Sequence, residues 1–448
     1  MNETRALARF VSETRYADLP PEAIEAVRIY ILDDFASGFA GARTPWAAMV
    51  ASLVQADSKG ACSLFGRGWT SSAAGAALLN GVAIGGFETD HPYTAGSCHP
   101  SGAVFPAAMA AAELKRIDGR EFLTAVALGY EALCRVGAAA TRAVEDERGF
   151  HGPGTNAPLG GAFGAGRVLG VSAETLVNAL GIAGSHGGGL LEFFREGAMT
   201  KRLHLGRGAQ LGLESVLLAQ RGFTGPSTVI EGEHGFLNAY SPAARPELLL
   251  DGLGHRWLLL DVTLKSYPCH ISFHAVIDAI HRFRQEHPVE PGGIESVTIR
   301  SAARMIEARF SAREPTTLMG AQYSLPWSTA LALCEDATDP ATWTEEALAN
   351  ERVNRIAAAM RLLREAPTAP EAVAEIRLVV AGREHVVNAT GWKGAPSDPY
   401  TFGDMAQKFR RYASNLLTPA RSDEIVQRVR NLEAEPDVAS LIRMIRAG

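Results

Sequence analysis

Residues 100–144 read "PSGAVFPAAMAAAELKRIDGREFLTAVALGYEALCRVGAAATRAV", and this stretch decides the fold. It predicts two helices separated at Asp118 and Gly119, because Asp118 can cap a helix and Glu121 follows three residues later in a capping-box arrangement. The many alanines and glycines on both segments leave little side-chain bulk between helix axes. We therefore expect a closely packed, mostly helical core.

Helical periodicity extends on both sides of this stretch. Apolar residues recur at spacings of three and four near the N-terminus, Ser172 can cap a later helix, and residues 201–220 form another. After Lys265 the pattern changes to a helix, a strand at 294–300 and two strands around Gly382, before helices return at Thr401. This order predicts a discontinuous helical domain, residues 1–264 and 396–448, with an inserted α+β domain at residues 265–395.

Bulk composition excludes several classes of protein. The chain has 448 residues, 47% of them hydrophobic, and its net charge of −6 comes without a basic stripe, which argues against nucleic-acid binding. The five cysteines form no CxxC pair, so we expect neither a disulfide framework nor a cysteine-rich zinc site. We find no secretory leader and no uncharged apolar stretch long enough to cross a membrane, and we expect a cytoplasmic protein with no membrane partner.

Four short segments concentrate the residues that can carry chemistry. They read "FETDHPYTAGSCHPSG" (87–102), "GFHGPGTNAPLGG" (149–161), "EGAMTKRLHLGRGAQ" (196–210) and "LKSYPCHISFH" (264–274). Each has a plainer interpretation: a polar surface loop, a solvated loop histidine, cations at a helix start that face solvent, or histidines satisfied at a helix N-terminus. A bound anion is the alternative explanation for Lys201 and Arg202, because a helix N-terminus disfavours cations.

Familiar cofactor motifs are missing from the sequence. "GAGRVLG" follows no strand and is not a GxGxxG, no GxxxxGK[ST] occurs, and "GSHGG" is not a GxSxG. His270 and His274 stand four apart but lack a third ligand nearby, so we expect no metal and no cofactor. The remaining acids, imidazoles and lysines suit proton transfer at a carbon next to a carboxylate.

Five blocks of the sequence resemble the MmgE/PrpD family. They are "FETDHPYTAGSCHPSGAVFPAAMAAAE", "GFHGPGTNAPLGGAFGAGRVLG", "MTKRLHLGRGAQLGLESVLLAQRGFTGP", "KSYPCHISFHAVIDA" and "YSLPWSTALAL", in the family's order and across nearly the whole chain. The resemblance implies a large helical domain with a smaller α+β lid domain, usually in a homodimer. It also implies cofactor-independent chemistry on a small polycarboxylate.

The same resemblance assigns roles to individual residues. It implies that His99 and His151 are the proton-transfer pair and that Lys201 binds a carboxylate. Many relatives read roughly Asp-Phe-Asp-Asp-Thr-His where this chain has "FETDH", so Asp90 is our choice for the family's catalytic aspartate and Glu88 is its rival. The candidate substrate-binding residues are Thr94, His91, Glu88, Arg202, Lys265 and Tyr267.

Three reactions fit these residues, and a fourth interpretation has no reaction. Our first hypothesis is a lyase of the 2-methylcitrate dehydratase type. A cis-aconitate-type decarboxylase would use the same cations but protonate the carbon that remains after loss of carbon dioxide. An epimerase of an iminodisuccinate-like substrate would return the proton to the opposite face. The non-enzymatic alternative is a helical dimer that binds an organic acid.

Overall fold

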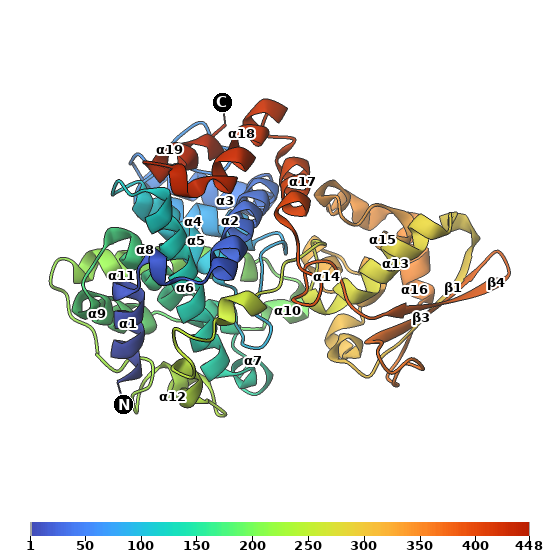
Figure 1. The fold of residues 1–448 in the computed structure, drawn as a ribbon. Coiled ribbons are helices and arrows are strands. Elements are labelled where there is room, and N and C mark those ends of the chain that lie inside the picture. The colour runs from blue at the N-terminus through green and yellow to red at the C-terminus, as the bar shows by residue number, and fades with distance from the viewer. Residues whose placement is uncertain (1, 448) are drawn as a thin grey trace. The chain divides into compact units, whose positions relative to one another are not determined.

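The computed structural model describes residues 2–447 and divides into two compact units. The helical unit contains the chain up to Leu191, Thr200–Thr263 and the chain from Tyr400 onward, and the α+β unit contains Glu192–Met199 and Leu264–Pro399 (Figure 1). The mostly helical fold expected from the sequence is confirmed. The sequence-based boundary after residue 264 lies one residue from the structural one, but the sequence did not assign residues 192–199 to the α+β unit.

Local capping signals set where the helices of the helical unit begin. Asp118 and Ser172 cap α6 and α9 as the sequence predicts, although Asp118 does so through one hydrogen bond from the Glu121 N–H (2.9 Å) and not through the two bonds of a capping box. Thr401 forms a capping box with Asp404 where the helices return. The helices are α1 (Glu3–Glu13), α2 (Pro21–Ala42), α3 (Pro45–Asp57), α4 (Ala73–Gly85), α5 (Pro100–Ala112), α6 (Gly119–Ala140), α7 (Ala143–Asp146), α8 (Gly152–Leu169), α9 (Ala173–Gly184), α11 (Lys201–Ala219), α12 (Phe236–Tyr240), α17 (Phe402–Ala413), α18 (Pro419–Arg430) and α19 (Val438–Ile442).

Three helices at the centre of this unit run in the same direction. Along α8 and α11, Gly154 lies beside His204 and Gly212 lies beside the Pro158 carbonyl, so the two helices advance together from their N-termini. Along α5 and α8, Gly160 lies beside Ala103 and Gly164 lies beside Ala108. A Cβ atom on Gly212 would stand 2.4 Å from the Pro158 carbonyl oxygen, so these contacts require glycine. The N-termini of α5, α8 and α11 therefore lie at the same end of the core.

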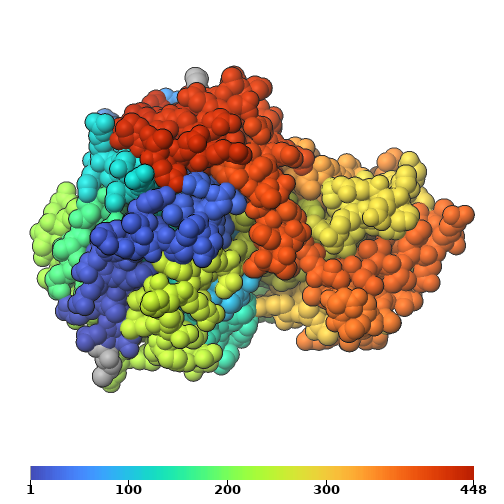
Figure 2. Space-filling view, viewed as in Figure 1, coloured from blue at the N-terminus to red at the C-terminus, as the bar shows by residue number. Residues whose placement is uncertain are grey.

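The last segment of the chain closes the helical unit against its first segment. Helix α17 packs on α2, and the C-terminal helices lie directly beside the N-terminal ones on the face shown in Figure 2. The contact includes an ion pair, because the Lys408 ammonium donates to the Asp33 carboxylate at 2.5 Å. This explains why a helical domain interrupted by some 130 residues in the sequence is still one unit.

Helix α6 is the one described helix that is long and apolar enough, by length and composition, to cross a membrane. This differs from the sequence expectation, which required an uncharged stretch. In the structure 94% of its apolar window is buried inside the protein. Its buried ion pair between Glu131 and Arg135 is also part of the protein core (2.7 Å). We therefore describe α6 as a core helix.

The α+β unit is built around a four-stranded sheet with the order β2-β1-β3-β4. Strands β1 (Ile294–Arg300), β3 (Ala374–Val380) and β4 (Arg383–Ala389) match the three predicted strands, while the three-residue β2 (Arg361–Leu363) was not predicted. Ala381 and Gly382 both have positive φ, as a two-residue hairpin turn requires. The helices of this unit are α10 (Phe193–Glu196), α13 (His274–Glu286), α14 (Leu318–Gln322), α15 (Leu325–Cys334) and α16 (Glu351–Ala359).

A buried arginine on α6 holds a long loop of the helical unit in place. The Arg135 guanidinium donates to Glu131 and to the carbonyl oxygens of Leu249 (3.3 Å), Asp251 (2.9 Å) and Arg256 (2.7 Å). Glu131 in turn accepts a hydrogen bond from the Leu259 N–H at 2.9 Å. Four hydrogen bonds from one buried pair therefore order residues 249–259.

We expect Arg135→Met to lower the free energy of unfolding by about 3–5 kcal/mol, because it leaves the Glu131 charge buried without its cation. The double variant Glu131→Gln/Arg135→Met removes both charges and should lose clearly less. Urea unfolding followed by far-ultraviolet circular dichroism measures both. Unfolding midpoints for Arg135→Met that match the wild type would mean that the pair does not support the core.

Candidate active site

His99 stands at the N-cap of α5 and is held by Asp90. The Nδ1 atom of His99 lies 2.6 Å from Oδ2 of Asp90. Asp90 is fully buried, whereas the His99 side chain keeps 16% of its surface exposed. Because a carboxylate accepts, Nδ1 carries a proton and Nε2 is the nitrogen that can exchange protons with a bound molecule. The structure thus orients the imidazole as a general acid or base requires.

Glu88 occupies a strained backbone position in the segment between α4 and α5. Its φ is 61°, in the left-handed region that favours glycine, which costs about 1–3 kcal/mol for other residues. Its buried carboxylate accepts from the Lys201 ammonium and lies 3.7 Å from Arg202. A side chain kept where glycine fits better indicates that the carboxylate itself is needed.

Lys201 and Arg202 begin α11 and are buried, with 5% and 2% of their surfaces exposed. The expectation that solvent surrounds these cations is therefore wrong, and the anion beside them is Glu88. Arg202 also donates to the Gly86 carbonyl, and its guanidinium carbon lies 4.4 Å from the Trp46 ring centroid. Through these contacts Arg202 holds the segment that carries Glu88 in place.

His151 stands at the N-cap of α8 and pairs with His204 of α11. The two Nδ1 atoms are 2.9 Å apart, so one ring donates and the other accepts. Burial lowers the pKa of His151, and electrostatic interactions with His204, Lys201 and His99 lower it further, while Glu88 raises it. Burial, with the Lys201 charge, also lowers the pKa of His204, to about 4. Both imidazoles are therefore neutral at neutral pH.

The structure brings the main predicted residues into one electrostatic neighbourhood. His99, Lys201 and Glu88 all lie close enough to His151 to shift its pKa. Each of the two histidines is an N-cap and Lys201 is the first residue of its helix, so three helix N-termini point into this region. Helix N-termini and buried cations together favour an anion.

His91 has a different position from the one expected for a substrate ligand. It is fully buried, with Nδ1 3.0 Å from Asp33 and Nε2 2.8 Å from the Tyr130 hydroxyl. The Tyr130 hydroxyl donates to Asp34 (2.6 Å), so Nε2–H of His91 must donate to Tyr130. Although burial lowers the pKa of His91, the two aspartates outweigh it and raise that pKa. Both ring nitrogens are already bonded, which argues against contact between His91 and a substrate.

The other predicted substrate ligands lie in various places. Thr94 is exposed in the turn at 94–97. Lys265 and Tyr267 are buried in the α+β unit, where the Tyr267 hydroxyl donates to Asp278 at 3.2 Å. Their contact with a substrate stays a prediction. Among residues 2–447 there is no group of three or more His, Cys, Asp or Glu side chains that could hold a metal ion.

Sequence reasoning missed His204 and the acids beneath the loop. His204 follows Lys201 by three residues on one helical face, which is a usable signal. Asp33 and Asp34 stand side by side in the apolar stretch "IYILDDFASGFA", and two adjacent acids in a buried helix indicate buried partners. Those partners, His91 and Lys408, are distant in sequence and gave no signal.

Two family models match most of the chain. The model of the MmgE/PrpD N-terminal domain matches residues 5–249, and that of the C-terminal domain matches residues 267–433. The chain belongs to the MmgE/PrpD family. The prediction of a lyase-type enzyme of this family is thereby confirmed. The C-terminal family model runs through α17 and α18, which the structure assigns to the helical unit.

Several relatives are named for one activity. The chain is 27% identical to the cis-aconitate decarboxylase-like protein oryM of Aspergillus oryzae, over 99% of this chain and 97% of the relative. It is 28% identical to the cis-aconitate decarboxylase of Homo sapiens, over 83% and 79%. It is 29% identical to the cis-aconitate decarboxylase of Aspergillus terreus, over 64% and 61%.

The buried imidazole pair gives the fold a pH dependence. His204 has an ordinary pKa of 6.5 and a folded-state pKa of about 4, so the unfolded chain binds a proton first as the pH falls. Its contribution to stability is complete above pH 6.5 and is lost towards pH 4. We expect His204→Gln to make the decline in unfolding midpoint over this range shallower.

Thermal unfolding at a series of pH values checks this expectation. The control is His255→Gln, which removes an exposed histidine elsewhere in the helical unit. A His204→Gln profile as steep as that of the wild type would contradict the buried neutral pair.

Proposed function

We propose that this chain is a carboxy-lyase that removes carbon dioxide from a small polycarboxylate of the cis-aconitate type. The observation that carries the proposal is the meeting of His99, His151 and Lys201 at three helix N-termini. The names of the relatives favour decarboxylation over the dehydratase reaction that we placed first from the sequence. The substrate and reaction are therefore assigned as a proposal within the family.

The charges of the site suit a substrate with several carboxylates. Two buried cations, Lys201 and Arg202, face one carboxylate, Glu88, so these three groups carry one positive charge in excess. The positive ends of α5, α8 and α11 add to that charge. A polycarboxylate that enters this region gains electrostatic stabilisation that a neutral molecule would not.

The proposed reaction balances without an electron acceptor. In cis-aconitate the carbon–carbon bond to the carboxylate on the saturated carbon breaks, and carbon dioxide leaves. The freed electron pair forms a new double bond to the central carbon, and the pair of the old double bond moves to the far carbon, next to another carboxylate. One proton added there completes the product, so a trianion and a proton give a dianion and carbon dioxide.

The two histidines differ in what their surroundings allow. His99 is partly exposed and held by Asp90, so Nε2 can deliver the proton to the far carbon. His151 is buried and its pKa is lowered, so it serves as a neutral hydrogen-bonding group for a substrate carboxyl. Lys201 stabilises the negative charge that develops on the carboxylate next to the protonated carbon.

Incubation of the protein with cis-aconitate in D₂O tests the reaction by proton NMR. We expect release of carbon dioxide and a product with one deuterium on the far carbon of the old double bond, the one that bears a carboxylate and receives the proton. His99→Ala should lower the rate on the order of a hundredfold or more, because it removes the general acid. His255→Ala is the matched control, since it removes an exposed histidine of the same unit.

The same experiment with 2-methylcitrate, citrate and iminodisuccinate separates the alternatives. Loss of water would support the dehydratase, and exchange with inversion would support the epimerase. No change in any of the four compounds would sink the substrate class. Turnover of cis-aconitate that persists unchanged in His99→Ala would remove His99 from the mechanism.

Asp90 and Glu88 are expected to affect different kinetic constants. Asp90→Asn should lower kcat on the order of a hundredfold with little change in KM, because it disturbs the orientation of the His99 imidazole. Glu88→Gln should lower KM, since it removes a carboxylate that competes for Lys201, and should lower the thermal stability of the ligand-free protein. Steady-state kinetics distinguishes them. A larger loss of kcat in Glu88→Gln than in Asp90→Asn would mean that Glu88, and not Asp90, is the catalytically important carboxylate of the segment between α4 and α5.

A further inference from the structure

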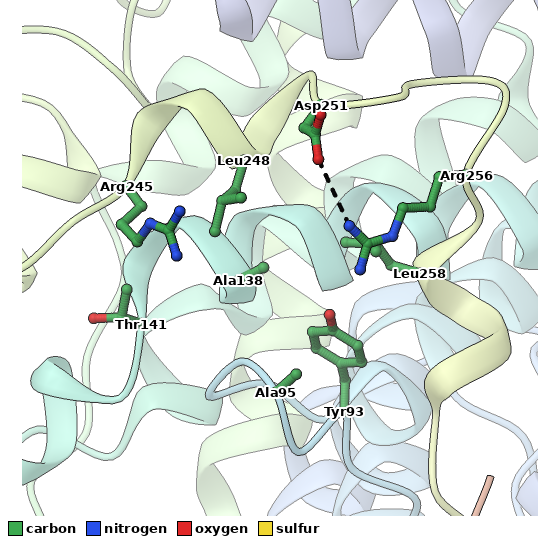
Figure 3. Close-up of a pocket in the computed structure, with 9 residues that line it drawn as sticks. All are labelled: Tyr93, Ala95, Ala138, Thr141, Arg245, Leu248, Asp251, Arg256 and Leu258. Carbon is green, nitrogen blue, oxygen red and sulfur yellow. Dashed lines mark ion pairs between the residues drawn. The ribbon is translucent and has the colours of Figure 1, made fainter.

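A cavity of about 500 Å³ lies in the helical unit, where Tyr93 and Ala95 of the segment between Asp90 and His99 form part of its lining. Its lining comes from the turn after Tyr93, the C-terminal end of α6 and the loop at residues 245–258 (Figure 3). None of the lining residues is His99, His151 or Lys201. We call it the arginine cavity, after Arg245 and Arg256. Its volume is within the range of small-molecule sites.

Tyr93 places a polar group at the base of the arginine cavity. The side chain is only 3% exposed, and its hydroxyl points into the cavity in Figure 3. No hydrogen bond joins this hydroxyl to any of residues 2–447. Burial raises the pKa of Tyr93, so the hydroxyl keeps its proton and can donate. A hydroxyl that faces a cavity can donate a hydrogen bond to an acceptor that a ligand supplies.

Two guanidinium groups lie on opposite sides of the same cavity (Figure 3). Arg256 is 3.6 Å from Asp251 and Arg245 is 3.0 Å from Glu247, and all four side chains are more than half exposed. Exposed ion pairs of this kind contribute little, so a ligand carboxylate can replace either partner. Guanidinium groups bind carboxylates with two parallel hydrogen bonds.

The remaining walls are apolar and fixed. Leu248, Leu258 and Ala138 supply the apolar surface. The loop that carries Leu248 and both arginines is anchored by the buried Arg135 through the carbonyls of Leu249, Asp251 and Arg256. The cavity is therefore shaped before a ligand arrives, which reduces the entropy lost on binding.

We propose that the arginine cavity is a second binding site, for a small organic carboxylate with an apolar part, and that its occupant acts on His99. The carboxylate would lie between Arg245 and Arg256, with the Tyr93 hydroxyl as a third donor and the apolar part against the two leucines. This site is separate from the catalytic one and does not depend on the reaction proposed above.

The link to His99 runs through one short turn. The Tyr93 N–H donates to the Cys98 carbonyl at 3.0 Å, and Cys98 is the residue before His99. The end of the turn next to His99 is also held by α8, because Asn156 donates to the Ser97 carbonyl at 2.7 Å. A ligand that contacts Tyr93 therefore bears on the same turn that separates Asp90 from His99.

Binding is measured by isothermal titration calorimetry on the full-length protein with glutarate, 3,3-dimethylglutarate and benzoate, and with inorganic phosphate as an anion without an apolar part. We expect at least one of the three carboxylates to bind more tightly than phosphate. Arg245→Ala/Arg256→Ala should weaken that binding by roughly tenfold or more, because it removes both charged donors. Tyr93→Phe removes only the hydroxyl and should weaken binding severalfold.

Two controls locate the site. Arg410→Ala removes an exposed, ion-paired arginine of the same unit and should bind as the wild type does. His99→Ala/Lys201→Ala disables the catalytic region and should also retain binding. The proposed site would be overturned if none of the carboxylates binds, or if phosphate binds as tightly as they do. It would also be overturned if Arg245→Ala/Arg256→Ala binds as tightly as the wild type, or if His99→Ala/Lys201→Ala loses binding.

The effect on His99 is followed by NMR of protein with isotope-labelled histidine, with the His99 signal identified by its absence in His99→Ala. The bound carboxylate should shift this signal in the wild type and leave it unchanged in Arg245→Ala/Arg256→Ala. Binding without any shift of His99 would overturn the proposed link. This readout requires no turnover, so it fails or succeeds independently of the decarboxylase proposal.

Discussion

The parallel packing of α5, α8 and α11 is the constraint on which the candidate active site depends. Glycine and alanine bring these helices into contact and keep them advancing together, so their N-termini lie at one end. Parallel helices place the positive ends of their dipoles together, which is unfavourable unless anions are present. Glu88 and Asp90 supply fixed negative charge there, and a polycarboxylate substrate would supply more. The helix packing and the choice of substrate class thus have one electrostatic origin.

The segment between α4 and α5 is held in place by buried charges of both signs that pair with one another. His91 and Lys408 carry positive charge, and Asp33 and Asp34 carry negative charge. Burial raises the pKa of Asp34 to about 6, although its neighbours His91, Ser101 and Tyr130 oppose that shift. Burial of ions is costly unless each is paired, and here every charge has a partner. This support allows Glu88 to keep a strained backbone and Asp90 to keep its position against His99.

Features encoded by neighbouring residues were predictable from the sequence, and features that depend on distant partners were not. The caps at Asp118, Ser172 and Thr401 and the hairpin at Gly382 depend on a few adjacent residues, and each is present. The burial of His91 depends on Asp33, 58 residues away, and the closing ion pair joins Asp33 to Lys408 across 375 residues. Within "ETDH" the side chains of Glu88, Asp90 and His91 take different partners, so spacing alone could not separate substrate ligands from supporting residues. The motif resemblance located His99, His151 and Lys201, because those blocks carry the helix starts themselves.

The two proposed catalytic histidines show how position alone can divide one chemistry between identical side chains. Both stand at helix N-caps, where the dipole disfavours a positive charge. At His99 the Asp90 carboxylate lies 2.6 Å from Nδ1 and holds the ring through that nitrogen, which leaves Nε2 as the nitrogen that can exchange a proton. At His151 the neighbour is another imidazole, and nearby cations add to burial, so the ring stays neutral. The two histidines thus differ in their partners and in their burial, and this difference is the basis for proposing proton transfer at His99 and hydrogen bonding at His151.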